Sequence, residues 1–401
     1  MNMEVVSRFS LPTEIVYGVN SVSMLGNEVK RLGGKKAFFV TDAGVKESGI
    51  LEKAYQTLKD AGIAFNVFDG VSSDPTDKDI DGMVSMSKVE GCDCIIGAGG
   101  GSVIVAAKAA AVGANNEGQT IQYVEGENKY PNPSLLCVIV PTTAGSGAEV
   151  SKGTTITDSR TKSKVRILGY RHAVRLAILD PTLLITVPRV QAIASGVDAL
   201  THAIEAYLSE VASTLTDCIA LKSIEMIANN LCRSVFTIDL EAKGQMLLGS
   251  TMANIAVSNA NVGLSHLLNG VLTYTYQTRK LEPMMYGLIH AVLLPPTLEF
   301  TLAACQNKIE PLAQAMGVIT QGKSLSELGK GIIERLTNLL NDLGAPRKLV
   351  WKNLSAEDIV EAGIKIGRIS FDQTKQGTNV VRKYSREDLI AILQKTLHKG
   401  Q

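Results

Sequence analysis

The sequence predicts two domains, an α/β domain over residues 1–185 and an all-α domain over residues 186–401. Three observations support this prediction. Short apolar runs alternate with helical patterns in the first half, a glycine-rich turn follows one of those runs, and the pattern from about Val190 onward is almost wholly helical. The boundary is expected between Asp180 and Pro188, because prolines interrupt the pattern there.

The elements follow one another in a regular order. Each expected strand is a short apolar run, whereas a helix such as 50–61 places Leu51, Ala54 and Leu58 on one face. We expect strands at residues 36–41, 65–68, 94–96 and 136–140. We expect helices at residues 50–61, 77–88, 103–112, 197–208, 216–231, 244–260 and 355–369. Alternating strands and helices predict a parallel sheet with helices on both faces.

Composition narrows the class of protein. Of the 401 residues, 45% are hydrophobic and 20% are charged, as is ordinary for a soluble globular protein. The 40 Lys and Arg nearly balance the 39 Asp and Glu, so no nucleic-acid partner is expected. No apolar run reaches the roughly 20 residues of a spanning helix, so no membrane association is expected. The six scattered cysteines form no CxxC pair and fit a cytoplasmic location.

A glycine-rich turn lies between the third expected strand and the helix that follows it. Its sequence, Gly97 to Ser102, contains three consecutive glycines, which let the backbone approach a ligand with no Cβ in the way. The helix N-terminus behind it offers free N–H groups and a partial positive charge. The turn therefore predicts a phosphate-binding loop in a nucleotide-binding domain. The alternative is an ordinary tight strand–helix turn.

Two further segments carry polar groups that suit a dinucleotide. The loop from Pro141 to Glu149 contains two adjacent threonines and a Gly-Ser-Gly turn, which supply small hydrogen-bonding groups against a flat ligand. An ordinary turn explains the same residues equally well. Asp42 ends the first strand, where a carboxylate can bind a ribose hydroxyl pair and repel a 2′-phosphate. The alternative role for Asp42 is a helix N-cap.

One expected helix carries an Asp and a His four residues apart. Asp198 and His202 therefore lie on one face and can share a metal ion. Their apolar neighbours would bury that face, so a satisfied core histidine is the alternative. A third candidate ligand is His266, and His290 precedes the apolar run that ends at Leu294.

Five motifs occur in the order typical of one family. They are the glycine-rich turn at 97–102, PTTAGSGAE at 141–149, DPTLL at 180–184, GVDALTHAIEAYLS at 196–209 and GLIHAVLLP at 287–295. On these motifs the chain resembles the iron-containing (group III) alcohol dehydrogenases over nearly its whole length. The resemblance implies a Rossmann-like N-terminal domain and an all-α C-terminal domain, an architecture shared with dehydroquinate synthases. It also implies NAD(P)-dependent interconversion of an alcohol and an aldehyde or ketone.

The resemblance implies a cofactor site. The pyrophosphate of the dinucleotide would lie on Gly99, Gly100, Gly101 and Ser102. The nicotinamide side would meet Thr142, Thr143 and Ser146. Asp42 matches the position associated with NAD rather than NADP, and Lys164 resembles the basic residue near the cofactor ribose.

The resemblance also implies a metal site and a dimer. Asp198, His202 and His266 match three of the four residues that hold Fe²⁺ or Zn²⁺ in the family. The extended segment from Phe9 to Tyr17 matches a segment that commonly pairs with its copy in a second subunit, so a homodimer is expected. The resemblance also implies a small alcohol or aldehyde as the substrate.

The chain departs from the family pattern at positions that carry chemistry. Tyr286 stands where the family has its fourth ligand, a His. Gly270 stands where the family has a second His that assists proton transfer, and Val105 replaces an acidic residue. The stretch between His266 and Tyr286 is also longer than in the family. These departures predict a divergent metal site.

Three hypotheses follow from the departures. In the first, Asp198, His202 and His266 hold a catalytic metal, and His290 replaces the lost ligand because it lies one helical turn from Tyr286. In the second, the enzyme is a metal-independent carbonyl reductase in which Tyr286 and Lys280 polarise the carbonyl. In the third, the chain is a catalytically silent NAD-binding regulatory protein.

Overall fold

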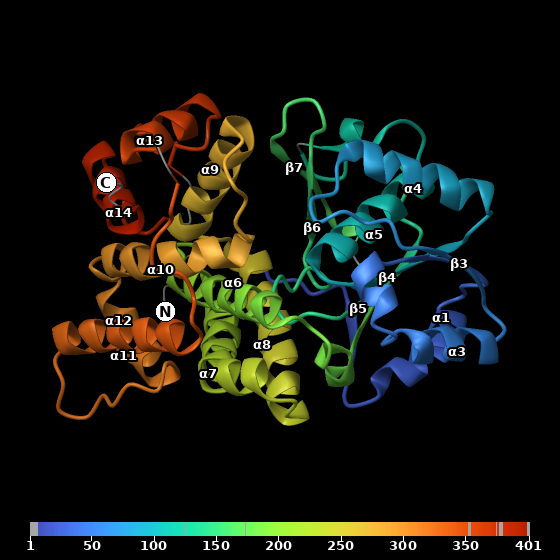
Figure 1. Cartoon of the computed structure of the whole chain (residues 1–401), viewed down its shortest axis with the longest axis horizontal. Helices are drawn as coiled ribbons and strands as arrows, with labels where there is room; N and C mark the ends of the chain where they lie inside the picture. Colours follow the sequence, from blue (N-terminus) through green and yellow to red (C-terminus); the bar gives the residue numbers. More distant parts are fainter. Residues whose placement is uncertain are drawn as a thin grey trace. The chain divides into compact units, whose positions relative to one another are not determined.

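The computed structural model of the chain describes residues 7–124, 126–172, 174–351, 354–373, 375–376 and 380–398. The chain divides into two units (Figure 1). The sheet unit contains Ser10–Pro188 and Ile238–Thr251, and the helical unit contains Arg189–Thr237 and the chain from Met252 onward. One helix, α8 (Leu240–Ala260), therefore contributes residues to both units.

The sheet unit is built on a six-stranded sheet in the order β1-β8-β5-β4-β2-β3, and all neighbouring strands are parallel. Its strands are β1 (Glu14–Tyr17), β2 (Lys36–Val40), β3 (Ala64–Phe68), β4 (Cys94–Gly99), β5 (Leu136–Pro141) and β8 (Leu176–Leu179). The four expected strands correspond to β2, β3, β4 and β5. Our sequence analysis did not predict β1, β8 or the antiparallel hairpin of β6 (Gly153–Thr157) and β7 (Lys164–Leu168). Strands β1 and β8 have only four residues each, which is a short pattern to recognise. The hairpin strands β6 and β7 contain polar Thr, Lys and Arg, so they do not form apolar runs.

Helices cover both faces of this sheet (Figure 1). They are α1 (Leu25–Arg31), α2 (Ala43–Glu47), α3 (Glu52–Asp60), α4 (Asp77–Val89) and α5 (Gly101–Ala114). Successive residues of a strand point to opposite faces, so Phe38 packs with α4 and α5 whereas Phe39 packs with α1 and α3. The expected parallel sheet with two covered faces is confirmed.

The helical unit contains the remaining helices of the described chain. They are α6 (Arg189–Leu208), α7 (Thr214–Phe236), α9 (Leu264–Arg279), α10 (Tyr286–Leu302), α11 (Gln306–Ala315), α12 (Leu325–Asp342), α13 (Ala356–Lys365) and α14 (Arg386–Thr396). Several begin at serines whose side chains form capping boxes, namely Ser213, Ser324, Ser355 and Ser385. The expected all-α C-terminal architecture is confirmed.

Helices α6 and α10 approach each other closely at one glycine. A Cβ atom on Gly287 would lie 1.8 Å from the carbonyl oxygen of Ala194, so only glycine fits at this contact. Gly287 stands directly after Tyr286 and one turn before His290. The contact therefore brings the first turn of α10 against the middle of α6, where Asp198 and His202 lie.

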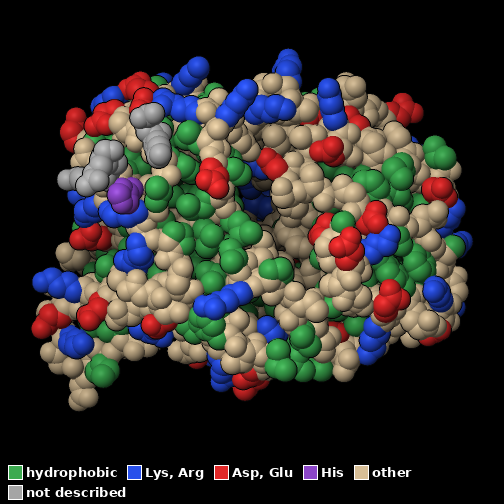
Figure 2. Space-filling view, in the orientation of Figure 1, with side chains coloured by type: hydrophobic (Ala, Val, Ile, Leu, Met, Phe, Trp, Pro, Cys, Tyr) green, Lys and Arg blue, Asp and Glu red, His purple; other side chains and the backbone are tan. Residues whose placement is uncertain are grey.

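The surface agrees with the balanced charge of the sequence. On the face shown in Figure 2, Lys and Arg side chains are interspersed with Asp and Glu. Within the described part of the chain, no helix has both the length and the apolar character needed to cross a membrane.

Candidate metal centre and dinucleotide loops

Three side chains converge at the crossing of α6, α9 and α10. Asp198 Oδ1 lies 3.7 Å from His266 Nε2 and 3.6 Å from His290 Nε2. One potential ligand atom from each of these residues lies within 4.8 Å of the other two. His290 and His266 are buried, and Asp198 is nearly so. This is a carboxylate and two imidazoles gathered around one small space.

Among the described residues, the converging atoms have no hydrogen-bond partners. Asp198 Oδ1, His266 Nε2, His290 Nε2 and His202 Nδ1 are all buried and unpaired in the structure. Leaving a buried polar atom unpaired costs about 1–3 kcal/mol, so four in one place need an explanation. A divalent cation bound between them would satisfy them together, and an Asp–His donor set suits such a cation.

Glu205 fixes the orientation of His266. Its Oε2 lies 2.6 Å from His266 Nδ1, and its two oxygens also accept hydrogen bonds from the backbone N–H groups of Gly263, at 2.8 Å, and Ser265, at 2.6 Å. A proton on His266 Nδ1 leaves the Nε2 lone pair free to face Asp198. Carboxylates that orient metal-bound histidines in this way are a recurring part of metal sites.

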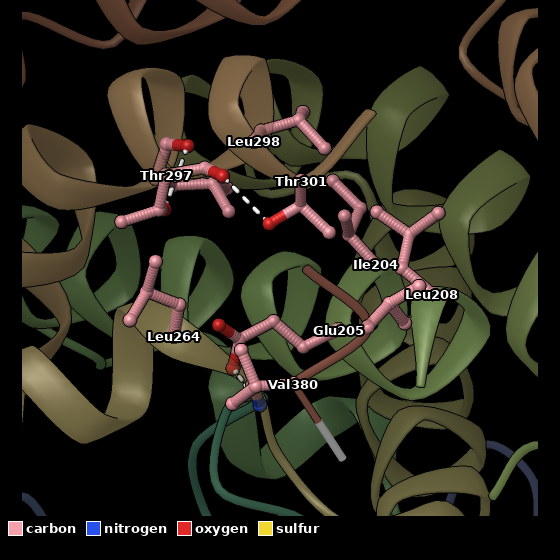
Figure 3. Close-up of a pocket in the computed structure, with 11 residues that line it drawn as sticks. Ile204, Glu205, Leu208, Leu264, Thr297, Leu298, Thr301 and Val380 are labelled. Atoms are coloured by element: carbon pink, nitrogen blue, oxygen red, sulfur yellow. Dashed lines mark hydrogen bonds between the residues drawn. The ribbon is translucent and has the colours of Figure 1, made fainter. Parts of the chain in front are cut away.

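The same carboxylate borders a small pocket (Figure 3). In this view the Glu205 carboxylate lies near Leu264 and Val380, while Thr297 and Thr301 lie across the pocket. The pocket is lined by Ile204, Glu205, Leu208, Gly263, Leu264, Leu294, Thr297, Leu298, Thr301, Val380 and Val381. These mostly apolar residues give the Glu205–His266 pair surroundings of low dielectric constant, in which its electrostatic attraction is stronger than in water.

Ser265 fixes the orientation of His290. The Ser265 hydroxyl lies 2.8 Å from His290 Nδ1, which leaves Nε2 directed toward Asp198. Both histidines therefore present the same ring nitrogen to the site, and each is held by a partner on its other nitrogen.

His202 lies beside this group. Its ring stacks on that of His266, with centroids 4.5 Å apart, and its Nδ1 is 3.8 Å from Asp198 Oδ2. The predicted pairing of Asp198 and His202 on one face of α6 is therefore present in the structure. The tightest group of ligand atoms, however, contains His290 rather than His202.

Burial and charge set the protonation of these groups. Burial lowers the pKa of His202 to about 4 and that of His290 well below its usual value, so both rings stay neutral. Burial opposes ionisation of Asp198, but His202, His266 and His290 together hold its pKa below its usual value. Burial also opposes the charging of His266, but Glu205 and Asp198 outweigh it and raise its pKa to about 9. A cation at Nε2 would compete with that proton.

The two residues of the metal-independent hypothesis lie in different surroundings. The Tyr286 ring packs edge-on against His290 at 5.1 Å and lies 6.2 Å from His266, and 41% of the residue remains exposed. Lys280 is an exposed residue in left-handed backbone at the C-terminal end of α9. Among the described residues, no hydrogen bond or ion pair joins Lys280 to Tyr286.

The glycine-rich turn has the geometry of a close-packed strand–helix junction. Cβ atoms on Gly97 and Gly99 would lie 2.6 Å from side-chain atoms of Ala107 and Val103, so these two glycines let α5 pack on the sheet. Gly100 and Gly101 instead face the second loop, opposite Thr143 and Ser146. The first turn of α5 has no side-chain cap and keeps its N–H groups available for an anion.

The two predicted cofactor loops lie together. The backbone N–H of Thr142 donates to the carbonyl of Gly99 at 3.0 Å. The hydroxyl of the half-buried Ser102 donates to the carbonyl of Ser73 at 2.6 Å. The carboxyl ends of β4 and β5 thus carry the glycine turn and the threonine loop side by side, which is the usual place for a ligand in a parallel sheet.

Asp42 and Lys164 each have a partner. Asp42 caps α2, with its Oδ1 accepting from the N–H of Val45 at 2.9 Å, so the N-cap alternative is present in the structure. Lys164, at the start of β7, forms an ion pair with Asp74. Neither contact tests a role beside a cofactor ribose.

Sequence reasoning missed Glu205 and Ser265. A signal for Glu205 was available, because positions 198, 202 and 205 follow the one-face spacing of a helix. Ser265 carried no such signal, because its partner His290 lies on another helix.

Comparison with known proteins decides the family. The family profile described as iron-containing alcohol dehydrogenase matches residues 12–181, and that for the C-terminal part of the family matches residues 192–397. The chain belongs to the iron-containing alcohol dehydrogenase family. It is 35% identical to 1,3-propanediol dehydrogenase of Klebsiella pneumoniae over 375 residues, which cover 92% of this chain and 95% of that protein.

Other members of the iron-containing alcohol dehydrogenase family are also similar. NAD-dependent methanol dehydrogenase of Bacillus methanolicus is 31% identical over 355 residues, which cover 88% of this chain and 91% of that protein. The crystal structure of a 1,3-propanediol oxidoreductase superposes with a TM-score of 0.89 at 32% identity, covering 98% of this chain and 100% of that one. The predicted family and the predicted oxidoreductase class are confirmed.

Proposed function

We propose that this chain interconverts a small alcohol and its aldehyde or ketone with NAD as the hydride carrier and a divalent metal at Asp198, His266 and His290. The observation that carries the proposal is the group of unpaired, buried ligand atoms from these residues and His202. His202 adds a fourth donor beside Asp198. The donor set suits Fe²⁺ or Zn²⁺.

The reaction is balanced by NAD⁺, which takes the hydride, and by water, which takes the proton. In the oxidative direction the carbinol C–H bond breaks, its hydride joins the nicotinamide, the O–H proton leaves, and NAD⁺ becomes NADH. When bound, the metal supplies a Lewis acid that draws electron density from the substrate oxygen.

The side chains of this protein prepare the site for that chemistry. Glu205 and Ser265 hold the imidazoles of His266 and His290 with their Nε2 atoms facing Asp198. The ring of Tyr286 packs against His290 and shields part of the cluster from water. A dry, prearranged site of this kind makes each electrostatic interaction stronger than it would be in water.

For the cofactor we propose the two adjacent loops of the sheet unit. The pyrophosphate would take the N–H groups at Gly99, Gly100, Gly101 and Ser102, where α5 begins. Thr142, Thr143 and Ser146 would line the nicotinamide side. The Val45 N–H bonds Oδ1 of Asp42, and we propose that Oδ2 accepts from a ribose hydroxyl, which favours NAD over NADP, with Lys164 near that ribose.

A homodimer through the first strand completes the proposal. β1 lies at the edge of the sheet, paired only with β8 among the described strands, and Tyr17 at its end is 44% exposed. An edge strand can pair with a second copy of itself. Light scattering after size exclusion should give twice the mass of the chain, and a monomer would contradict the dimer.

The metal hypothesis is tested by removing the metal and one ligand separately. The enzyme is stripped with a chelator, reloaded with Fe²⁺ or Zn²⁺, and assayed by NADH absorbance with 1,3-propanediol and propanal. We expect activity to be lost and regained with the metal, and His290→Asn to lower both bound metal and activity.

Two control variants separate the alternatives. Tyr286→Phe and Lys280→Met should each retain metal and turnover. Full activity in the stripped enzyme, lost in Tyr286→Phe, would instead support a metal-independent reductase. NAD binding without any turnover in the metal-loaded enzyme would support a silent regulatory protein.

A further inference from the structure

Arg368 occupies the space beside Gly270, next to the candidate metal centre. A Cβ atom on Gly270 would lie 2.8 Å from Nη1 of Arg368 and 3.2 Å from its Cζ. Gly270 follows His266 by one turn of α9, on the same face. The guanidinium therefore lies over bare backbone one helical turn from His266, at the position where the resemblance implied a second histidine.

The end of α13 holds Arg368 in this place. The helix ends at Lys365, and Gly367 adopts left-handed backbone with φ of 68°. The N–H groups of Arg368 and Ile369 both donate to the carbonyl of Gly363, at 3.0 and 3.1 Å. Ile369 is only 3% exposed and packs on Gly363. The backbone that carries the guanidinium is thus fixed by hydrogen bonds and core packing.

The described part of the chain offers no counter-charge to Arg368. Among the described residues, no carboxylate forms an ion pair with it, and the side chain is exposed. An exposed guanidinium one helical turn from His266, with no acidic partner among the described residues, can meet an anion from solution.

We propose that Arg368 binds the carboxylate of the substrate, so that the preferred aldehyde or alcohol carries a carboxylate group. This inference rests on the proposed function. The planar guanidinium matches the two oxygens of a carboxylate in a bidentate pair, and its single charge neutralises one carboxylate. Arginine keeps its proton at all working pH values, so it cannot take over proton transfer from the absent histidine and acts as a binding group.

Matched substrates test the proposal. Succinic semialdehyde and butanal have the same chain length and differ in the terminal carboxylate. With the metal-loaded enzyme and NADH, we expect a higher kcat/KM for succinic semialdehyde. Arg368→Gln should raise the KM for succinic semialdehyde by about tenfold or more and leave the KM for butanal and for NADH unchanged. The KM of Arg368→Lys for succinic semialdehyde should lie between that of the unmodified enzyme and that of Arg368→Gln.

The control is Lys365→Gln, which removes an exposed positive charge at the end of α13, three residues before Arg368. Lys365→Gln should leave the preference for succinic semialdehyde over butanal unchanged, because a bidentate contact depends on Arg368 alone. A general effect of positive charge on this surface would instead be reduced by either substitution. Equal KM changes for both aldehydes in Arg368→Gln, or no change for either, would overturn the proposal.

A binding measurement separates this inference from the proposed function. If neither aldehyde is reduced, the proposed function fails, and calorimetric titration of the metal-loaded protein with succinate then decides the role of Arg368. Binding that Arg368→Gln abolishes supports the carboxylate site. Binding that is absent, or equal in the two proteins, contradicts it.

Discussion

Asp198 and His290 face each other across α6 and α10, with Oδ1 and Nε2 3.6 Å apart, and neither atom has a hydrogen-bond partner in the part of the chain that the structure describes. Both atoms are buried. When the proton of the neutral His290 ring is on Nδ1, facing the Ser265 hydroxyl, the Nε2 lone pair faces Asp198. Two such acceptors are stable at this distance only when a proton or a cation lies between them. This distance adds His290 to the candidate ligands Asp198, His202 and His266 that match the family pattern.

Glu205→Gln should weaken metal binding. The change removes the negative charge opposite His266 Nδ1 while keeping the size of the side chain. Loss of an outer partner of this kind typically costs about 10–100-fold in metal affinity. Competition with a coloured chelator measures the affinity. Glu310→Gln, an exposed change on α11, is the matched control, and equal affinities in both variants would count against the role of Glu205.

Gly287→Ala should damage both stability and the metal site. Its methyl group would lie 1.8 Å from the Ala194 carbonyl oxygen, so α10 must move away from α6. We expect a loss of about 3 kcal/mol or more in the free energy of unfolding, together with weaker metal binding. Gly329→Ala is the control, because nothing lies within 4 Å of its added Cβ and it should stabilise α12 by up to about 1 kcal/mol. Similar melting temperatures for the two variants would contradict the close contact.

Gly101→Ala should weaken cofactor binding without unfolding the protein. The added Cβ would lie 3.1 Å from the Ser146 hydroxyl and would narrow the space between the two loops. We expect the Kd for NADH, measured by fluorescence titration, to rise by about tenfold, which corresponds to about 1.4 kcal/mol. Gly82→Ala, in open space on α4, should bind NADH as the unmodified enzyme does. An unchanged Kd in Gly101→Ala would remove this turn from the proposed site.

His172 should make stability depend on pH in the sheet unit. Burial lowers the pKa of His172 to about 3, whereas an unfolded histidine titrates near about 6.5. Between these values the unfolded chain binds the extra proton, so stability falls as the pH drops, by up to about 1.4 kcal/mol per unit from this group. Denaturant unfolding at pH values within that window measures the slope.

The free energy of unfolding should depend less steeply on pH in His172→Gln, because this change removes the titrating ring that contacts Tyr130. His398→Gln, an exposed change near the C-terminus, should leave it as it is. The prediction is wrong if the two variants lose stability with falling pH at the same rate.

Local spacing determined a large part of this protein from the sequence by itself. The change from short apolar runs alternating with helices to an almost wholly helical pattern predicted the α/β and all-α halves, because such patterns depend on neighbouring residues alone. The same reasoning placed Asp198 and His202 on one face of α6, and placed the glycine turn between β4 and α5. Four-residue strands such as β1 carried too little pattern to be found.

Tertiary structure decided which residues complete the site. His290 reaches Asp198 only because Gly287 lets α10 touch α6, and Glu205 meets His266 from a position 61 residues away. Arg368 lies over Gly270 only because α13 packs on α9. These contacts join helices far apart in the chain, and their geometry depends on side-chain packing between helices. No single stretch of sequence contains that information.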